Sequence, residues 1–300
     1  MKQLRRLFLF AGFDKDNIVD DTVVYYVRAL SELGDVVFIA DNDLPKSEIE
    51  KISEIPNVLY ADAVRHCEYD FGSYKRGYLW AKHNDLLDNY DWVYFVNDSV
   101  YGPLWNLALT LSGLEKSGAD FVGMTSNSAT NRPVHIQSWF IGFSAPVFTA
   151  KFFDDFMQKI TRQPDKTSLI FKYEVGLSCL IMRHGFQSKT VLDSVKNKAY
   201  RDPWWAVSQG MPFVKKLAVQ NLGRLYFLYP FVDNDVVLNL MTEHMRRHNM
   251  VFNQPSDTLY EMRFLGVPLI RICQRGSATY KVYLFNSIPI LKIKNKLSKK

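Results

Sequence analysis

The 300-residue sequence predicts an α/β fold in which a Rossmann-type mixed sheet is flanked by helices and followed by a C-terminal helical and basic extension. Three observations support this prediction. Short apolar runs, typical of strands buried on both faces, recur along the first half of the chain. Stretches with helical spacing separate these runs, and strand–helix–strand order requires crossover connections and therefore parallel strands. Several apolar runs end abruptly in Asp or Asn, at the sheet edge where open α/β folds bind ligands.

The first part of the chain alternates strands with helices. Asp20 to Thr22 are residues that cap helix N-termini well, and Gly34 stands where a helix commonly ends. Neither GxGxxG nor GxxxxGK[ST] occurs, so the dinucleotide-binding and P-loop fingerprints are absent. The elements expected here are strands at Leu7–Phe13, Val36–Ala40 and Val58–Tyr60, with helices at Val23–Leu33 and Pro45–Glu54.

The later elements are expected from the same apolar periodicity. The segment HIQSWFIGF alternates its side chains and predicts one strand whose polar residues share a face. The remaining strands are expected at Val93–Val96, Ala119–Met124 and His135–Phe143, and the helices at Ser73–Leu87, Leu104–Leu114, Lys151–Ile160, Lys172–His184 and Asn234–Arg247.

The composition is that of a globular protein, with 47% apolar and 23% charged residues. Five lysines in the last nine residues supply most of the net charge of +6 (6 − 5 = +1 without them), which argues against a nucleic-acid partner. Three cysteines without CxxC spacing favour a reducing compartment. No apolar run reaches the roughly 18 residues of a membrane span, and no cleavage site follows Leu7–Phe13, so a cytoplasmic protein is expected.

The segment YDWVYFVNDSVYGP contains the most informative strand end. Its apolar run stops at Asn97, Asp98 and Ser99, which would lie at the carboxyl edge of a parallel sheet. We hypothesise that Asp98 holds a divalent cation, Mg²⁺ or Mn²⁺, against the diphosphate of a nucleotide sugar. The alternative is that these three residues only cap the following helix.

Two further segments carry charged residues that are expected at helix N-termini. Lys75 and Arg76 would lie in the first turn of their helix, where a bound phosphate would offset their unfavourable interaction with the helix dipole. Glu174 would also lie in a first turn, which suits a carboxylate with or without a chemical role. The alternative for Lys75 and Arg76 is that they are solvated surface cations. The alternative for Glu174 is that it only stabilises the helix dipole.

A third segment raises the question of a metal pair. His244 and His248 stand four residues apart, but neither a third ligand nor an HExxH pattern accompanies them. A solvated helix face is the expected reading.

Several segments, in order along the chain, resemble those of the rhamnan-synthesis F proteins, which are glycosyltransferase-like proteins of bacterial surface polysaccharide assembly. The resemblance implies a GT-A-type fold and a nucleotide-sugar donor, often dTDP-rhamnose in related proteins. The C-terminal YKVYLFNSIPILKIK is also similar to the ends of many bacterial polysaccharide glycosyltransferases. The matching segments are YDFGSYKRG (69–77), VNDSVYGPL (96–104), DFVGMT (120–125), HIQSWFIGF (135–143), YEVGLS (173–178) and GMPFVKK (210–216).

The layout also resembles the broader inverting GT-A pattern, and this resemblance implies roles for particular residues. Glu174 is expected to act as the general base of an inverting transfer, because a positioned carboxylate can accept the proton of the acceptor hydroxyl. Asp98 would bind the metal and the diphosphate. The other expected contacts are Asp41, Asp70, Gly72, Lys75, Arg76 and Asn97 at the donor, and His135, Gln137 and Trp139 at the sugar or acceptor.

Two departures from the family pattern bear on these roles. Arg65 to Glu68 replace an expected Arg-x-Asn-x-Gly pattern, and Asp98 stands alone where a DxD motif would supply two carboxylates. The second departure leaves strict metal dependence open.

The sequence as a whole predicts a glycosyltransferase domain over residues 1–230, with a donor half to about residue 125 and an acceptor half after it. Residues 231–300 form the extension, whose Lys292–Lys300 tail is expected to bind an anionic membrane surface beside a lipid-linked glycan acceptor. The alternative for the tail is a terminal strand with a frayed basic end. The alternative functions are a non-catalytic carbohydrate-binding or scaffold subunit and a nucleotidyltransferase.

Overall fold

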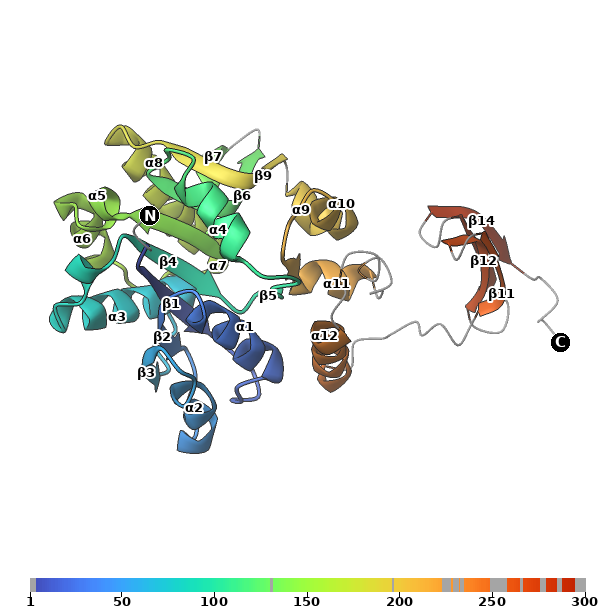
Figure 1. The fold of residues 1–300 in the computed structure, drawn as a ribbon, viewed down its shortest axis with the longest axis horizontal. Helices are drawn as coiled ribbons and strands as arrows, with labels where there is room; N and C mark the ends of the chain where they lie inside the picture. The colour runs from blue at the N-terminus through green and yellow to red at the C-terminus, as the bar shows by residue number, and fades with distance from the viewer. Residues whose placement is uncertain are drawn as a thin grey trace.

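The computed structural model describes residues 4–129, 132–195, 197–222, 228, 232, 235–248, 258–264, 267–275, 279–284 and 288–294. Within these residues an eight-stranded mixed sheet lies at the centre of the body (Figure 1), and a two-stranded and a four-stranded sheet accompany it. The predicted α/β fold with flanking helices is therefore confirmed.

The strands begin and end close to the expected residues in the first half of the chain. Their bounds are β1 Arg6–Gly12, β2 Asp35–Ala40, β3 Val58–Ala63, β4 Trp92–Asn97, β5 Val100–Tyr101, β6 Phe121–Ala129, β7 Arg132–Ile136, β8 Phe140–Ser144, β9 Ser188–Val195, β10 Val214–Lys215, β11 Thr258–Phe264, β12 Val267–Arg275, β13 Thr279–Leu284 and β14 Ile288–Lys294.

Helices connect most of these strands. The α-helices are α1 Asp21–Ser31, α2 Lys46–Ser53, α3 Tyr69–His83, α4 Ala108–Glu115, α5 Ala145–Phe148, α6 Lys151–Gln158, α7 Lys166–Leu169, α8 Gly176–Arg183, α9 Lys198–Arg201, α10 Pro203–Ser208, α11 Lys216–Leu222 and α12 Asp235–Arg247. A 3₁₀ turn, η1, covers Leu87–Asn89, and a π-helical segment, η2, covers Ile170–Val175.

The central sheet runs in the order β3-β2-β1-β4-β8-β6-β7, and β9 pairs with β6. Strands β1 to β4 are parallel to one another, β8 is antiparallel to both β4 and β6, and β9 is parallel to β6. Consequently β1, β2, β3, β4, β6 and β9 all point the same way. The loops that follow these strands meet at one edge of the sheet, where α/β folds bind their ligands.

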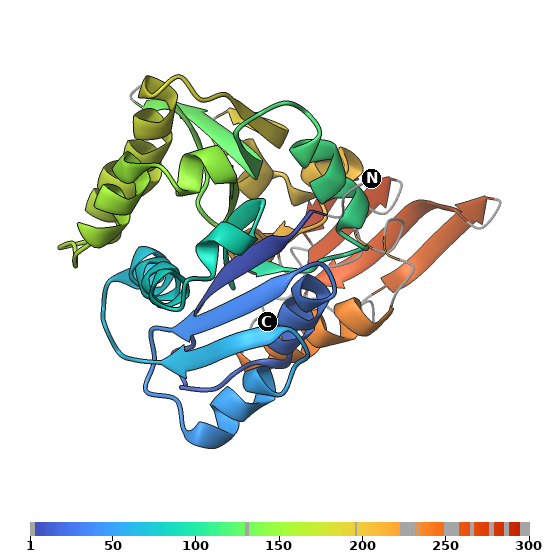
Figure 2. The same cartoon turned by 60° about the vertical axis from the view of Figure 1, so that its left-hand side comes forward.

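Alternating side chains of the central strands build a core on each face of the sheet. Phe8 and Phe10 of β1 pack toward α1, whereas Leu7 and Leu9 pack toward α3. In Figure 2 the blue helix α1 and the cyan helix α3 lie on opposite sides of the blue strands. Burial on both faces explains why these strands read as continuous apolar runs.

The expected single strand His135–Phe143 is interrupted. Strands β7 and β8 both lie along β6, but Gln137, Ser138 and Trp139 bulge out between them. The alternation of polar and apolar residues cannot reveal such a bulge, because the pattern continues on both sides of it.

Two helix starts also differ from the expectation. Helix α3 begins at Tyr69 rather than Ser73, so Lys75 and Arg76 lie in its second turn and not at its N-terminus. The helix expected at Lys172 begins at Lys166 and passes through η2, which places Glu174 in the middle of the helical run. The helix-dipole argument for these three residues is therefore wrong.

In the described part of the C-terminal extension, helix is present only at its start. Helix α12 lies beside α1 (Figure 1), and its Met241 and Met245 share a core with Tyr101. The described residues from 258 onward form an antiparallel sheet in the order β11-β12-β13-β14 rather than helices. Lys292 and Lys294 belong to β14, and the rest of the expected basic tail, from residue 295, lies outside the described residues.

Among the described residues, no helix is both long and apolar enough to serve as a membrane span.

Gly142 is a position where a larger residue should destabilise the fold. A Cβ at this residue of β8 would lie 2.2 Å from the ring of Tyr94, whose hydroxyl is held at 2.8 Å by Glu115. We expect Gly142→Ala to lower the free energy of unfolding by about 1–3 kcal/mol, because the ring cannot retreat without breaking that bond. Urea denaturation measures the change.

Gly113→Ala is the matched control. Gly113 is exposed in α4, and nothing lies within 4 Å of the Cβ it would gain. Alanine there should be neutral or stabilising by up to about 1 kcal/mol. Equal stabilities for the two variants would contradict the packing against Tyr94.

Candidate functional site

A cavity of about 860 Å³ lies at the carboxyl edge of the central sheet. Residues that follow parallel strands line it: Phe13 after β1, Asp41 after β2, Arg65 after β3 and Asp98 after β4. Because the topology brings these strand ends together, the cavity occupies the position expected for a ligand site. The second half of the chain closes it with Arg162, Gln163, Lys166, Glu174, Asn197, Tyr200, Lys215, Lys216 and Leu217.

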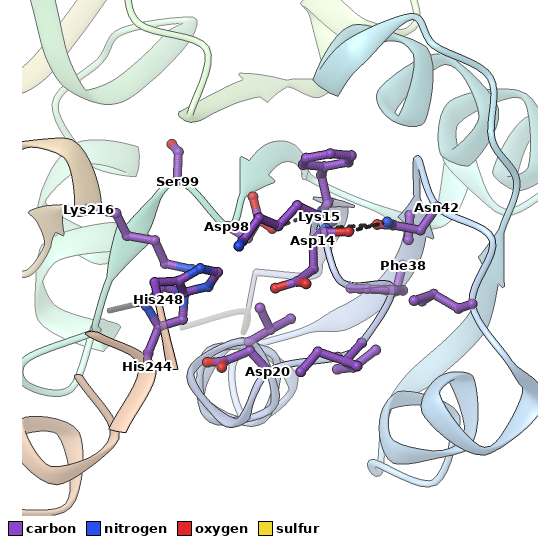
Figure 3. Close-up of a pocket in the computed structure, with 17 residues that line it drawn as sticks. Asp14, Lys15, Asp20, Phe38, Asn42, Asp98, Ser99, Lys216, His244 and His248 are labelled. Carbon is purple, nitrogen blue, oxygen red and sulfur yellow. Dashed lines mark hydrogen bonds between the residues drawn. The ribbon is translucent and has the colours of Figure 1, made fainter. Parts of the chain in front are cut away.

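A second cavity, of about 630 Å³, adjoins the first on the side of α1. Figure 3 shows Asp98 and Lys216 facing it together with Asp14 and His244, and Ser99 also lines it. The two cavities share Gly12, Phe13, Asp98, Ser99 and Lys216. Asp98 therefore stands at the junction of two adjoining spaces. The apolar part of the smaller cavity comes from Ile18, Val19, Val23, Phe38 and Leu44.

Asp98 and Asn97 hold the loop after β4 in place. The Asp98 carboxylate accepts the backbone N–H of Phe13 at 2.8 Å, which ties this loop to the end of β1. The side-chain oxygen of Asn97 accepts both the N–H and the hydroxyl of Ser99. Burial raises the pKa of Asp98, and the nearby Lys216 partly offsets this.

Asp70 is the carboxylate of the larger cavity with the most perturbed pKa. Asp70 is the second residue of α3, and its carboxylate accepts the Phe71 N–H and the side-chain amide of Asn97, the latter at 3.0 Å. Burial, followed by repulsion from Glu174, raises the pKa of Asp70 to about 6, while Lys166 opposes the rise. A carboxylate with such a pKa can both hold and release a proton near neutrality.

Glu174 lies across the same cavity on the π-helical segment η2, a type of helix distortion that is frequent at functional sites. Its Oε2 accepts the N–H of Ser138 at 2.8 Å and the Ser138 hydroxyl at 2.7 Å. Its Oε1 lies 3.4 Å from Nε2 of His135. Burial alone would raise the pKa of Glu174, but the contacts with His135 and Ser138 outweigh burial and lower it.

The predicted acceptor residues around the bulge between β7 and β8 do not all reach the larger cavity. Gln137 and Trp139 line the larger cavity, whereas His135 lies beneath it against Glu174. The Thr125 hydroxyl donates to the Gln137 side-chain oxygen at 2.8 Å and accepts the Trp139 indole N–H at 3.0 Å. Trp139 is only 4% exposed, so its ring is mostly part of the core.

Lys215 and Lys216 reach the site from a distant part of the sequence. Strand β10 pairs with β5 directly after Asp98, and the N–H of Lys216 donates to the Ser99 carbonyl at 3.1 Å. The Lys215 ammonium donates to the Ser99 hydroxyl at 2.8 Å. Our sequence prediction missed both lysines, although the segment GMPFVKK offered a signal in two cations after an apolar run.

Asp41 has a structural role, because its carboxylate binds backbone N–H groups of a neighbouring loop. One Asp41 oxygen accepts the N–H groups of His66 and Cys67, and Arg65 forms an ion pair with it at 2.9 Å. This carboxylate thereby organises the loop between β3 and α3, in which Cys67 and Tyr69 adopt positive φ angles of 58° and 57°. Asp41 lines the larger cavity from below this loop.

Three predicted donor contacts line neither cavity. Lys75 donates to the Ile160 carbonyl at 2.7 Å, and Arg76 forms an ion pair with Glu68 at 2.5 Å. A Cβ on Gly72 would lie 2.4 Å from the Cβ of Glu68, so this glycine allows close packing inside the fold. The expected phosphate contact of Lys75 and Arg76 finds no support in these positions.

The β1–α1 loop, beside the smaller cavity, is bound to α12. Arg247 contacts Asp14 at 2.5 Å, Asp16 at 3.1 Å and Asp20 at 3.2 Å. His244 is 2.8 Å from the Tyr101 hydroxyl. Burial and then Lys216 lower the pKa of His244 to about 3. His244 is therefore a neutral, buried residue of the wall, so the solvated helix face expected for it is wrong.

The residues around Asp98 do not fit the divalent cation that we expected there. Its carboxylate has the Phe13 N–H as a partner, the Asn97 oxygen is occupied by Ser99, and Lys216 carries a competing positive charge. In the described part of the chain, no group of three or more His, Cys, Asp or Glu side chains could hold a metal ion. Mg²⁺ is usually held by one or two carboxylates together with substrate phosphates and waters, so at this loop it would depend on the Asp98 carboxylate, which already accepts the Phe13 N–H beside the charge of Lys216.

The model of the family described as rhamnan synthesis protein F matches residues 36–262. The chain belongs to the rhamnan synthesis protein F family. This F-family chain is 26% identical over 153 residues to the uncharacterized protein y4gN of Sinorhizobium fredii (strain NBRC 101917 / NGR234). The match covers 50% of this chain and 39% of that relative.

Solved structures are similar to the F-family chain only at low TM-scores. A cytidylyltransferase from Leptospira borgpetersenii serovar Hardjo-bovis (strain JB197) has a TM-score of 0.40 at 12% identity, covering 84% of this chain and 98% of that chain. Core-mannan synthase A from Aspergillus fumigatus, in a Mn/GDP form, has a TM-score of 0.35 at 10% identity, with 59% and 69% covered. A glycosyltransferase involved in glycosylation of the major capsid of PBCV-1 has a TM-score of 0.36 at 12% identity, with 70% and 93% covered. These distant likenesses decide nothing about activity.

Proposed function

We propose that this F-family chain is a glycosyltransferase that moves a sugar from a nucleotide-sugar donor onto a growing bacterial cell-surface polysaccharide. The observation that carries the proposal is the larger cavity at the carboxyl edge of the sheet. It contains a carboxylate able to exchange a proton near neutral pH, Asp70, together with the buried Lys215 and the half-buried Lys216, which suit an anionic leaving group. Membership of the rhamnan synthesis family supports polysaccharide as the product.

The two adjoining cavities suit the two ends of a nucleotide sugar. The smaller cavity, with Val23 and Phe38 in its apolar wall, would take the nucleoside. The larger cavity would take the sugar and the acceptor hydroxyl, and the diphosphate would lie at their junction beside Asp98 and Ser99. The family resemblance favours dTDP-rhamnose as the donor and a lipid-linked glycan as the acceptor.

Of the two carboxylates in the larger cavity, Asp70 suits the role of general base better than Glu174. The oxygens of Glu174 face Ser138 and His135, and its lowered pKa makes it a weak proton acceptor. Among the described residues, the side-chain donor to Asp70 is the neutral amide of Asn97, and the pKa of Asp70 is raised to about 6. The best general base has a pKa near the working pH. Glu174 then acts as a positioning residue for the bulge at Ser138.

In the proposed inverting reaction, the acceptor oxygen forms a bond to the anomeric carbon as the bond from that carbon to the diphosphate oxygen breaks. The electron pair of the broken bond stays on the diphosphate, and the acceptor proton passes to Asp70. Preorganised positive charge near the leaving oxygen lowers the barrier, because the charge on that oxygen grows in the transition state.

The lysines proposed to contact an anionic membrane begin in a strand and not in a free tail. Lys292 and Lys294 stand in β14, where Lys292 pairs with Lys281 of β13 and Lys294 with Thr279. A basic edge of a sheet would then contact the lipid surface.

A thermal-shift screen tests the proposed function. The full chain is heated with dTDP, UDP and GDP sugars, with the free nucleoside diphosphates, and with free sugars. We expect one nucleotide sugar and its nucleoside diphosphate to raise Tm, because each binds only the folded chain. Release of that nucleoside diphosphate in the presence of a glycan acceptor would then identify transfer.

Two other outcomes separate the alternatives. Stabilisation by glycans alone, with no response to any nucleotide, would favour a carbohydrate-binding scaffold subunit. Stabilisation by nucleoside triphosphates with release of pyrophosphate from a sugar phosphate would favour a nucleotidyltransferase. Either result would overturn the proposed transfer.

A further inference from the structure

The junction of the two cavities contains positive charge where the expected metal site lacks ligands. We propose that Lys215 and Lys216, and not a divalent cation, neutralise the diphosphate of the donor, so that binding and transfer proceed without metal. This inference rests on the proposed function and extends it to the charge compensation at the leaving group. Three observations support it: the positions of the two lysines, the groups that surround them, and the small number of metal ligands near Asp98.

The fold fixes both lysines against the loop that would hold the diphosphate. Strand β10 pairs in antiparallel register with β5, with Lys215 opposite Val100. The Lys216 N–H bonds the Ser99 carbonyl, and the Leu104 N–H bonds the Pro212 carbonyl. The segment 212–216 is thus bonded to the loop after β4 at several points. Such support from rigid elements is what a preorganised charge requires.

Lys215 is buried, and among the residues that the structure describes no carboxylate contacts its ammonium directly. It is 7% exposed, its ammonium bonds the Ser99 hydroxyl, and it lies 4.4 Å from the centroid of the Trp139 ring and 5.0 Å from that of Tyr200. Burial lowers the pKa of Lys215 well below its ordinary value. Glu174, Asp70 and Asp98 partly offset this effect, and Lys166 adds to it. A buried cation in such surroundings is costly to the fold unless an anionic ligand compensates it.

Lys216 lines both cavities, and Figure 3 shows it on the wall opposite Asp14 and Phe38. Its ammonium lies 5.5 Å from the centroid of the Tyr101 ring. Burial lowers the pKa of Lys216, while Asp98, Asp20 and Asp14 act to raise it and Arg247 acts to lower it. The position at the junction suits a contact with the phosphate that joins the nucleoside to the sugar.

A divalent cation and these lysines would compete for one role. A metal ion bound at Asp98 would lie beside the Lys216 cation, and the nearby carboxylates of Asp14 and Asp20 are already paired with Arg247. In the metal-free arrangement, the two ammonium groups stabilise the charge that the diphosphate gains as its bond to the sugar breaks. Hydrogen bonds from cations to phosphate oxygens supply this stabilisation.

The test measures binding of dTDP, UDP and GDP to the full chain by calorimetry, once with EDTA and once with Mn²⁺ or Mg²⁺. We expect one of these nucleotides to bind with the same affinity, within about 3-fold, in both conditions. Binding that needs the metal would overturn the inference and leave the proposed function standing. Absence of binding in both conditions would overturn the proposed function itself, and this inference with it.

Substitutions then test whether these two lysines, and not other cations, bind the diphosphate. Lys216→Met and Lys215→Met should each weaken nucleoside diphosphate binding in EDTA by about 10- to 100-fold, because each removes a charge-assisted hydrogen bond. Both variants should fold with an unchanged or higher Tm, since methionine fills the space without a buried charge. Lys216→Arg, which keeps the charge, should restore most of the affinity.

Lys159→Met is the matched control, because Lys159 is exposed and lines neither cavity. Its binding should equal that of the unchanged chain. Lysine variants that fold and bind as tightly as this control would overturn the inference.

Discussion

Asp70→Asn is expected to lower kcat by about 10²- to 10⁴-fold. Asparagine has nearly the same shape and can still accept the hydrogen bond from Asn97, but it cannot take the proton of an acceptor hydroxyl. Rates of nucleoside diphosphate release measure the loss. Asp88→Asn is the control, because Asp88 is exposed and lines neither cavity, and its rate should be unchanged.

The same substitution should make the protein more stable. The pKa of Asp70 is raised from 3.8 to about 6, chiefly by burial and then by Glu174. Between these values the native chain binds more protons than the unfolded chain, so this group's contribution to stability falls as pH rises through that window. At neutral pH, Asp70→Asn should therefore raise the free energy of unfolding by roughly 2–3 kcal/mol.

Urea denaturation near pH 7 and near pH 4 checks this gain, which should be much smaller at the lower pH. A variant that is inactive and less stable would indicate that Asp70 only supports the fold. A variant that keeps its activity would exclude Asp70 as the base.

Glu174→Gln is expected to move the pH dependence of the reaction. In the unchanged chain, kcat/KM should rise with pH through about 6, because the base must be ionised. Repulsion by Glu174 is one cause of the raised pKa of Asp70, so removing that charge should shift the rise to lower pH. The loss of kcat should be about 10-fold, smaller than for Asp70→Asn, because glutamine still accepts hydrogen bonds from Ser138.

Stability should respond in the opposite direction to that of the Asp70 variant. The folded state lowers the pKa of Glu174 from 4.5, so the carboxylate stabilises the protein above that pH, and the contribution is lost as pH falls through the folded pKa. Glutamine should cost about 1–3 kcal/mol near pH 7. Glu54→Gln, at an exposed residue, is the control.

The two carboxylates could also have the reverse roles. If Glu174→Gln abolished turnover at every pH while Asp70→Asn left it within a few-fold, Glu174 would be the base, as the resemblance to the inverting GT-A pattern first implied. Measuring both variants over the same pH range distinguishes the two assignments.

Local patterns were enough to predict the first half of the fold. Strands such as β1 and β4 are buried on both faces, so their apolar runs mark them without any knowledge of neighbours. The position of Asp98 at the end of β4 followed from the same pattern. Local patterns failed for the start of α3, for η2 and for the bulge at Ser138. Tertiary hydrogen bonds, such as those from Ser138 to Glu174, accompany these irregularities.

The sequence by itself therefore determined the α/β class, the family and the strand end that carries Asp98. Only the tertiary structure decided which charges meet Asp98, because its partners come from distant parts of the chain. Lys215 reaches Ser99 across 116 positions through the pairing of β10 with β5, and Asp70 shares a cavity with Glu174 across the sheet edge. Long-range strand pairing and burial set these contacts and the pKa values that follow from them. A local residue pattern contains neither.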